Sequence, residues 1–429
     1  MTHALGFAGY LLMPLIGIAV WRLDAVRRLA LDGRLAIAGT AGTLIVALTM
    51  AGMSIAGAHW SRTPLVLLFA IFACAGAANR RIWSRGERWP RQWAALAGII
   101  IVLLITAYGL LTARETCGDL MFFWGPKGVH FFRAGKIDLA YLFDVQYFLG
   151  HRDYPPLLPL VFAWSHTVSR QFSWWAAVLF SGLCLAAIAA TVRAAARSDV
   201  AGLLAAAALA CAFASARVAG AADPLLLLFE ATAAAALTFI DDPRAQWILT
   251  AIGVAGAVLT KVEGIAFAVA VVVSILVVKR SLARATAVIP GALLIGTWLL
   301  VMVHNDMLDA YAGNGPLHIE YLPRVLVSTF RAAGYETYWL PWIVPLLVIA
   351  LGDFRRAAMP VAIAILTFGA TIYFYLHGPN DPTSWWVRSS APRVLLTPLV
   401  MLLIAAGASL NARSSVPAPA TAPASHPTG

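Results

Sequence analysis

The chain has 429 residues, of which 61% are hydrophobic and 12% are charged, and its formal net charge is +11. Soluble domains carry roughly 25% charged residues, so this composition excludes an ordinary soluble protein. The arginines stand in short clusters between apolar runs. That pattern is typical of membrane orientation signals, and it excludes a nucleic-acid surface as the reason for the basic charge.

The apolar runs are rich in Leu, Ala, Val and Gly, and they do not alternate with polar residues as transmembrane β-strands would. The predicted fold class is therefore an all-α polytopic membrane protein whose helices pack through small residues. The runs lie near residues 5–21, 35–58, 63–78, 92–112, 155–169, 173–192, 199–216, 224–240, 245–260, 264–278, 286–304, 338–352, 357–376 and 391–410.

Arginine clusters predict the orientation of the chain in the membrane. The clusters within 22–34 and 79–91 are expected on the cytoplasmic side, which places the loop 113–154 on the outer face. Later clusters share the inner side only if the run 155–169 does not cross. That run has fifteen residues and begins with two prolines, so it is expected to be interfacial or re-entrant. We therefore predict about thirteen transmembrane helices, with the N-terminus outside and the C-terminus inside; if 155–169 crosses, every later loop inverts.

The chain is expected to divide into three parts. Residues 1–91 form three additional N-terminal transmembrane helices, and the first run is expected to be a retained helix because it lacks a basic region and a cleavage site. Residues 92–410 form the core and carry the outer loop 113–154. Residues 411–429 are rich in Pro, Ala and Ser and are predicted to be disordered.

The outer loop carries the first candidate for chemistry. About forty residues join two apolar runs, and long ordered loops are usually functional. Asp119 follows a span directly and suits a general base or a ligand for a hydroxyl; a helix N-cap is at least as good an interpretation. Further along, His151, Arg152 and Asp153 precede two prolines. Arg152 suits a phosphate, and Asp153 can assist Asp119 or fix His151.

Three further segments carry charged residues at the ends of apolar runs. Asp223 precedes a proline, so a helix cap is the favoured role and a sugar hydroxyl the alternative. Lys261 and Glu263 lie in a turn between two short runs, where a polar cavity is favoured over a simple salt bridge. Arg393 enters the last run and either points into the same cavity or extends to the interface. No metal-ligand spacing occurs, so no residue is assigned to a metal.

The order of these motifs resembles that of the bacterial GT-C glycosyltransferases, in the branch of protein O-mannosyltransferases and lipid A aminoarabinose transferases. The resemblance covers about residues 92–410 and rests on their order and spacing together. The matching residues are Asp119, Trp124 with Lys127, His151 to Leu157, Gly220 to Leu225, Thr260 to Gly264, and Arg393. The chain departs from the pattern in its three additional N-terminal helices and in its second acid, which is either Glu115 or Asp153.

The resemblance implies a GT-C-like fold with a juxtamembrane helix in the outer loop. It implies transfer of a sugar, with inversion, from a polyprenyl-phosphate donor to a glycan, lipid or protein acceptor. The reaction would take place on the periplasmic face of a bacterial inner membrane, with no nucleic-acid partner and no cofactor assigned. By analogy Asp119 activates the acceptor, with Asp153 as the possible second acid. The residues expected at the phosphate or the rest of the substrate are Lys127, His151, Arg152, Tyr154, Asp223, Lys261, Glu263 and Arg393.

Two other functions fit a chain of this composition. A transporter or lipid flippase for envelope precursors would place polar residues near the middle of the membrane and use both faces. A non-catalytic scaffold of envelope assembly would need none of the charged residues for turnover. The clustering of informative polar residues on one predicted face favours the transferase.

Overall fold

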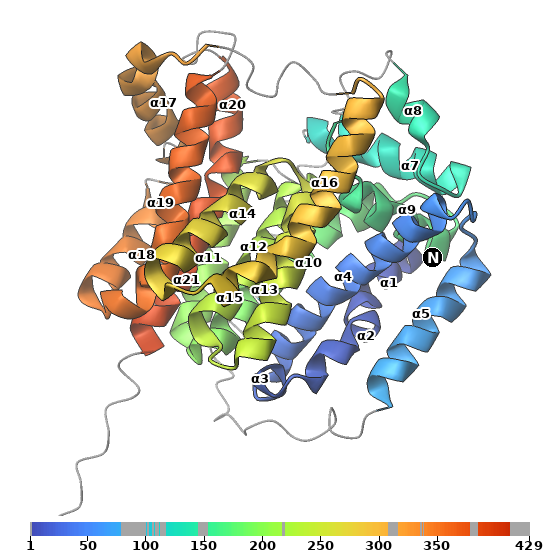
Figure 1. Cartoon of the computed structure of the whole chain (residues 1–429), viewed down its shortest axis with the longest axis horizontal. Coiled ribbons are helices and arrows are strands. Elements are labelled where there is room, and N and C mark those ends of the chain that lie inside the picture. Colours follow the sequence, from blue (N-terminus) through green and yellow to red (C-terminus); the bar gives the residue numbers. More distant parts are fainter. Residues whose placement is uncertain are drawn as a thin grey trace, which may run out of the picture.

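The computed structural model describes residues 2–78, 100, 103–104, 107, 111, 117–144, 153–216, 219–307, 316–334, 337, 339–377 and 385–411. Within these residues every regular element is helical, which confirms the predicted all-α class (Figure 1). Apolar runs of this length become helices because only a helix satisfies every backbone hydrogen bond without a partner segment.

The chain begins with α1 (Thr2–Leu11), α2 (Met13–Ile16), η1 (Ile18–Arg22), α3 (Asp24–Arg27), α4 (Leu31–Ile55) and α5 (Arg62–Ala77). The part around the outer loop contains η3 (Asp119–Trp124), α7 (Gly125–Ala134), α8 (Leu139–Phe143) and α9 (Leu157–Ser169). The central helices are α10 (Trp174–Ala196), α11 (Asp199–Ala216), α12 (Asp223–Phe239), α13 (Pro243–Thr260), α14 (Glu263–Ser274) and η5 (Ile275–Lys279). The remainder comprises α15 (Leu282–Ala285), η6 (Thr286–Val288), α16 (Ile289–His304), η7 (Ile319–Tyr321), α17 (Leu322–Gly334), α18 (Leu340–Leu351), α19 (Phe354–Leu376), α20 (Trp385–Val394) and α21 (Leu396–Asn411).

Five helical segments of the described residues are long and apolar enough to cross a membrane. They are Leu31–Ile55, Trp174–Ala196, Leu282–His304, Phe354–Leu376 and Val387–Asn411. The expected total of thirteen crossings stays a prediction. Helix α9 has thirteen residues, all of them buried, and at 1.5 Å per residue it is roughly 20 Å long. That is shorter than the ~30 Å hydrocarbon core, as the run 155–169 led us to expect.

The first apolar run does not form the single helix that the sequence predicts. It is divided into α1, α2 and η1, with breaks at Leu12 and Gly17. Gly17 packs directly on α4, where a Cβ would lie 2.0 Å from the carbonyl oxygen of Ala38. Gly42 of α4 makes an equally close backbone contact, since a Cβ there would lie 1.9 Å from the carbonyl oxygen of Met13. Close backbone packing onto α4 therefore replaces a continuous helix.

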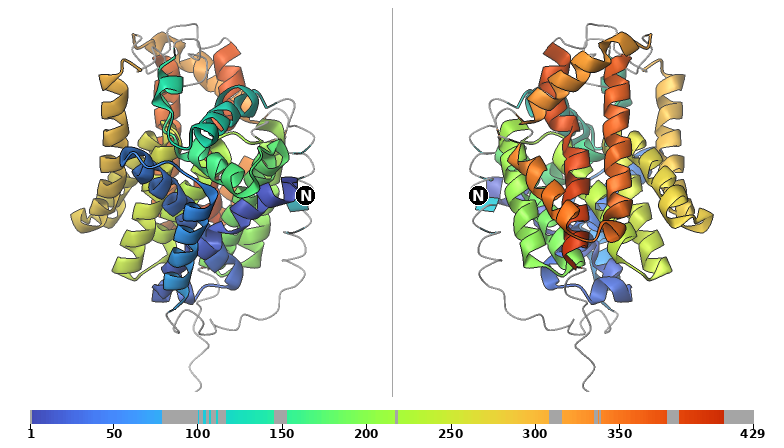
Figure 2. Two further views of the ribbon diagram at one scale, coloured as in Figure 1. Left: turned by 90° about the vertical axis from the view of Figure 1, so that its right-hand side faces the viewer. Right: turned by 90° about the vertical axis from the view of Figure 1, so that its left-hand side faces the viewer.

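The bundle has two opposite ends, with α3 at one and α7 and α8 at the other (Figures 1 and 2). Near the end that carries α3, Arg193 pairs with Asp32, at the start of α4, at 2.9 Å and with Asp199 at 2.5 Å. At the other end, the backbone N–H of Trp60 donates to the oxygen of Gly135 at the end of α7. The basic segment 22–34 and the later cluster of Arg193 and Arg197 were expected on one side, and the contact of Arg193 with Asp32 places them at the same end of the bundle. The α4–α5 connection lies beside the loop 113–154.

Helix α12 runs through the centre of the bundle, packed against α10, α13 and α21. Every residue from Asp223 to Leu237 is buried. Ala236 in its last turn belongs to the same apolar cluster as Ile18 and Trp21 of η1. Asp223, at its first turn, therefore lies toward the end of the bundle that carries η3 and α7.

Candidate functional site

Five charged side chains from four separate segments form one network near the start of α12. Arg393 Nη2 lies 2.5 Å from Asp119 Oδ2 and 3.3 Å from Asp223 Oδ2. Lys261 Nζ lies 3.1 Å from Asp223 Oδ1 and 2.8 Å from Glu263 Oε1. Asp223 is the centre of this network, which we call the ionic cluster. Three carboxylates face two cations in it, so an added anion would have to exchange with a carboxylate.

Asp119 enters the ionic cluster from the outer loop. It begins η3, a short stretch of π-helix, and such stretches frequently occur at functional sites. The N-cap position belongs to Gly118, and no side-chain cap bond forms. Asp119 therefore does not act as a helix cap. Its carboxylate turns to Arg393 instead and remains 19% exposed, which leaves it within reach of a ligand.

Asp223 was favoured as a helix cap, and this prediction is wrong. It is the first residue of α12, the N-cap residue is Ala222, and no cap bond forms there. With only 4% of its side chain exposed, Asp223 would be costly as an isolated charge. Its two oxygens are instead shared between Lys261 and Arg393. The cap assignment failed because the two cations come from distant parts of the chain.

Lys261 and Glu263 occupy the turn between α13 and α14, as the sequence indicated. The two alternatives offered for them are both present, since they form a salt bridge and also line a pocket. Lys261 is buried, while Glu263 is about one third exposed. Gly264 permits the tight turn: a Cβ there would lie 2.2 Å from the carbonyl oxygen of Ala257. The turn therefore holds an ammonium inside the protein beside Asp223.

An aromatic pair links the outer loop to the ionic cluster. Trp124 and Tyr154 stack with ring centroids 5.6 Å apart. Lys127 Nζ lies 5.3 Å from the Trp124 ring, and Lys261 Nζ lies 6.0 Å from the Tyr154 ring. Cations at such distances are attracted to aromatic faces. The Trp124–Tyr154 pair thus separates two buried lysines.

Burial sets the titration of Lys127 on α7. Only 3% of the residue is exposed, and desolvation lowers its pKa to about 7, against an opposing charge effect of Asp153. Asp153 itself is buried, and its backbone oxygen accepts a 2.8 Å hydrogen bond from the indole of Trp298. The structure therefore associates Asp153 with Lys127 and α16. The predicted residues Glu115, His151 and Arg152 lie outside the described residues.

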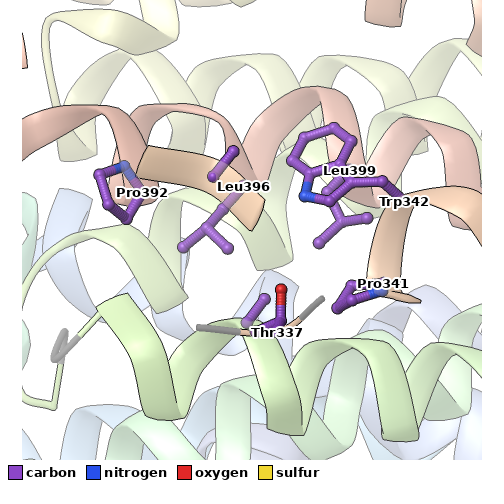
Figure 3. Close-up of a pocket in the computed structure, with 8 residues that line it drawn as sticks. Thr337, Pro341, Trp342, Pro392, Leu396 and Leu399 are labelled. Carbon is purple, nitrogen blue, oxygen red and sulfur yellow. The ribbon is translucent and has the colours of Figure 1, made fainter. Parts of the chain in front are cut away.

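Two pockets flank the junction of α20 and α21. The first is lined by charged and apolar groups: Asp223, Leu226, Leu227, Lys261, Glu263, Arg393, Val394 and Thr397. We call it the ionic pocket. The second is lined mostly by apolar residues. In Figure 3, Pro392 and Leu396 lie on one side of it and Thr337 and Pro341 on the other, with the ring of Trp342 beside Leu399. Neighbouring residues of one helix junction therefore border a charged and an apolar space.

Several polar atoms of this region are buried without a hydrogen-bond partner among the described residues. They include Trp124 Nε1, Arg393 Nε and Glu263 Oε2. An unsatisfied buried donor or acceptor costs about 1–3 kcal/mol. Bound water or a polar ligand would satisfy such groups.

Sequence reasoning missed one acid of this region. Glu230 lies two helical turns after Asp223 on α12 and has no exposed surface. Its Oε2 accepts a 2.7 Å hydrogen bond from the hydroxyl of Thr397, a residue that lines the ionic pocket. The signal was present, because a lone acid inside an apolar run is rare and usually functional. No group of His, Cys, Asp and Glu suited to a metal occurs within the described residues.

Comparison of this chain with protein-family models, curated proteins and solved structures finds no match in any of the three.

Proposed function

We propose that this chain is an integral-membrane glycosyltransferase, which moves a sugar from a polyprenyl-phosphate donor to an acceptor hydroxyl at the outer face. The observation that carries the proposal is the contact of Asp119 with Arg393 inside the ionic cluster. A candidate base and a candidate phosphate ligand, far apart in the chain, meet beside a pocket. The order of the sequence motifs supports the same function independently of this contact.

The donor phosphate would bind by exchange. Arg393 and Lys261 are both held by carboxylates, and a phosphodiester is an equally good partner for a guanidinium. When the phosphate takes a hydrogen bond from Arg393, Asp119 loses its own partner and becomes available to an acceptor hydroxyl. Donor binding and activation of the base would thus be coupled through one side chain.

The proposed chemical step is a displacement of the phosphate by the acceptor hydroxyl at the anomeric carbon of the sugar. The acceptor oxygen attacks the anomeric carbon of the sugar and gives its proton to the Asp119 carboxylate. The bond between that carbon and the phosphate oxygen breaks, and the phosphate leaves with the electron pair. Arg393 and Lys261 stabilise the added charge on the leaving group, an effect that is stronger in a dry site than in water.

The apolar pocket suits the first isoprenyl unit of the donor. It lies on the far side of the α20–α21 junction from the ionic pocket, and Pro392 lines it next to Arg393. A lipid phosphate whose head group reaches Arg393 would have its chain at this junction. Leu396 and Leu399 supply the hydrocarbon surface that such a chain requires (Figure 3).

The test measures sugar transfer by purified full-length protein in lipid vesicles, from labelled polyprenyl-phosphate sugars. Asp119→Asn should lower the rate about 10²- to 10⁴-fold, because the amide accepts no proton. Asp138→Asn is the matched control: Asp138 caps α8 in the same loop, and asparagine caps a helix equally well. Near-normal transfer by the Asp119 variant would remove the proposed role. Donor-independent uptake of substrate into vesicles would favour a transporter.

A further inference from the structure

The walls of the ionic pocket are built in two tiers. Asp223 and Arg393 form the upper tier, where α12 faces the α20–α21 junction. Glu230 of α12 and Thr397 of α21 form the lower tier. The spacing of seven residues on α12 returns Asp223 and Glu230 to the same helix face. Leu226 and Leu227 line the pocket between the tiers.

The lower tier has a defined hydrogen-bond direction. A threonine hydroxyl has one donor and two acceptor positions. Thr397 uses its donor on Glu230, at 2.7 Å. While Glu230 is a carboxylate, the positions that remain on the Thr397 hydroxyl are therefore acceptors. Glu230 fixes this direction, and its second oxygen, Oε1, is buried without a hydrogen-bond partner within the described part of the chain.

We propose that Thr397, oriented by Glu230, accepts a hydrogen bond from a hydroxyl of the donor sugar and so selects which sugar the protein takes. This inference rests on the proposed function. Thr397 stands four residues after Arg393, a rise of roughly 6 Å along a helix. A sugar ring bonded directly to a phosphate at Arg393 spans that distance. Thr397 is the binding residue, and Glu230 is a positioning residue that acts through it.

The residues that line the ionic pocket offer a sugar both polar and apolar contacts. The apolar Leu226 and Leu227 would face the C–H surface of a ring, and Thr397 would face one hydroxyl. An acceptor that a sugar hydroxyl must satisfy discriminates strongly between donors, because a missing hydroxyl leaves a buried group unpaired.

The experiment compares farnesyl-phosphate esters of glucose, mannose and arabinose with their single-deoxy analogues. For each donor, the KM and kcat of transfer and the thermal stabilisation of the full-length protein are measured. Wild type should prefer one hydroxyl by about tenfold or more, equivalent to one hydrogen bond. Thr397→Val should abolish that preference through KM, and Thr397→Ser should restore it.

The positioning role of Glu230 has its own readout. Glu230→Gln keeps an acceptor for Thr397 and should retain the preference, whereas Glu230→Leu should lose it. Thr238→Val is the control, since this hydroxyl of α12 bonds only within its own helix in the contacts described, to Ala234 at 2.7 Å. An equal loss for all donors in the Thr397 and Glu230 variants would overturn the inference.

The outcomes separate the two proposals. Transfer without hydroxyl preference would leave the glycosyltransferase function standing and overturn the role of Thr397. A hydroxyl preference in stabilisation, lost in Thr397→Val but without transfer, would support the subsite and contradict the transferase. Wild-type protein that neither binds nor transfers any of the sugar phosphates would overturn both.

Discussion

The guanidinium of Arg393 is hydrogen-bonded to the carboxylate of Asp119, although 274 positions separate the two residues in the chain. One residue comes from the start of η3 and the other from the end of α20. The same Nη2 atom also reaches Asp223. Arg393 thus ties the outer loop to the first turn of the central helix α12.

Replacement of this guanidinium tests its double contact. Arg393→Lys keeps a positive charge but loses the planar group that serves two carboxylates and a phosphate. Transfer should fall roughly 10- to 100-fold, since hydrogen bonds to charged groups contribute about 1.5–3 kcal/mol. The measurement is kcat/KM with a polyprenyl-phosphate sugar. Arg388→Lys, at an exposed position of the same helix, should be neutral; an equal effect at both positions would contradict the specific role.

Removing one partner of the Lys261–Asp223 pair should destabilise the fold, because both side chains are buried. Lys261→Met removes one partner and leaves a buried carboxylate with less compensation, so the free energy of unfolding should fall by about 3–5 kcal/mol. Adding Asp223→Asn should recover part of the loss, with a coupling energy above about 0.5 kcal/mol. Chemical unfolding in mixed micelles gives these values. Lys279→Met, at an exposed position, serves as the control, and strict additivity of the first two changes would argue against the pair.

The lowered pKa of the buried Lys127 side chain predicts how the free energy of unfolding depends on pH. Burial holds its pKa near 7 in the folded chain, against 10.5 as the ordinary value. Between these pH values the unfolded state binds more protons, so stability should rise with pH, by up to about 1.4 kcal/mol per unit. Lys127→Met should flatten this rise, which unfolding measured from pH 6 to 10 will reveal. The exposed Lys136→Met should leave the slope unchanged.

The same titration has the opposite effect on a phosphate contact. If Lys127 binds the donor as a cation, donor affinity should decrease as pH rises through about 7. A KM that is flat across this range in wild type would show that Lys127 does not bind the phosphate as an ammonium. The two measurements are independent, because one follows unfolding and the other follows donor binding.

The backbone conformation of Gly220 should affect the site through its contact with Leu120. Its φ of +76° lies in the left-handed region, and a Cβ would meet the Leu120 side chain at 2.5 Å. Gly220→Ala should cost about 1–2 kcal/mol of stability and reduce transfer, because Leu120 adjoins Asp119. Thermal unfolding and transfer rate are compared with those of Gly182→Ala, whose Cβ would meet nothing within 4 Å. Unchanged transfer by Gly220→Ala would show that this turn does not support the site.

Local signals predicted much of the fold. The runs 245–260 and 264–278 correspond closely to α13 and to α14 with η5, because helix formation in an apolar segment depends on near neighbours. The first run was predicted less well. Its division into short helices follows from contact with α4, where Gly17 and Gly42 allow the backbones to touch, and nothing within the run itself specifies that contact.

The candidate site was predicted in part for the same reason. Lys261, Glu263 and Arg393 were expected at a cavity, and they line the ionic pocket. Asp223 was assigned to a cap because its proline neighbour is the local signal, while its two cations are 38 and 170 positions away. Glu230 received no role, although its place in an apolar run marked it as unusual.

The amino-acid sequence by itself determined the helical class, most of the helix positions and the residue types able to bind a phosphate or take a proton. These properties depend on hydrophobicity, length and side-chain chemistry, which are local. The tertiary structure alone decided that Asp119, Asp223, Lys261, Glu263 and Arg393 share one network and that Thr397 faces Glu230. Such contacts join helices that are distant in the chain, and only the packing of the whole bundle sets which charges meet.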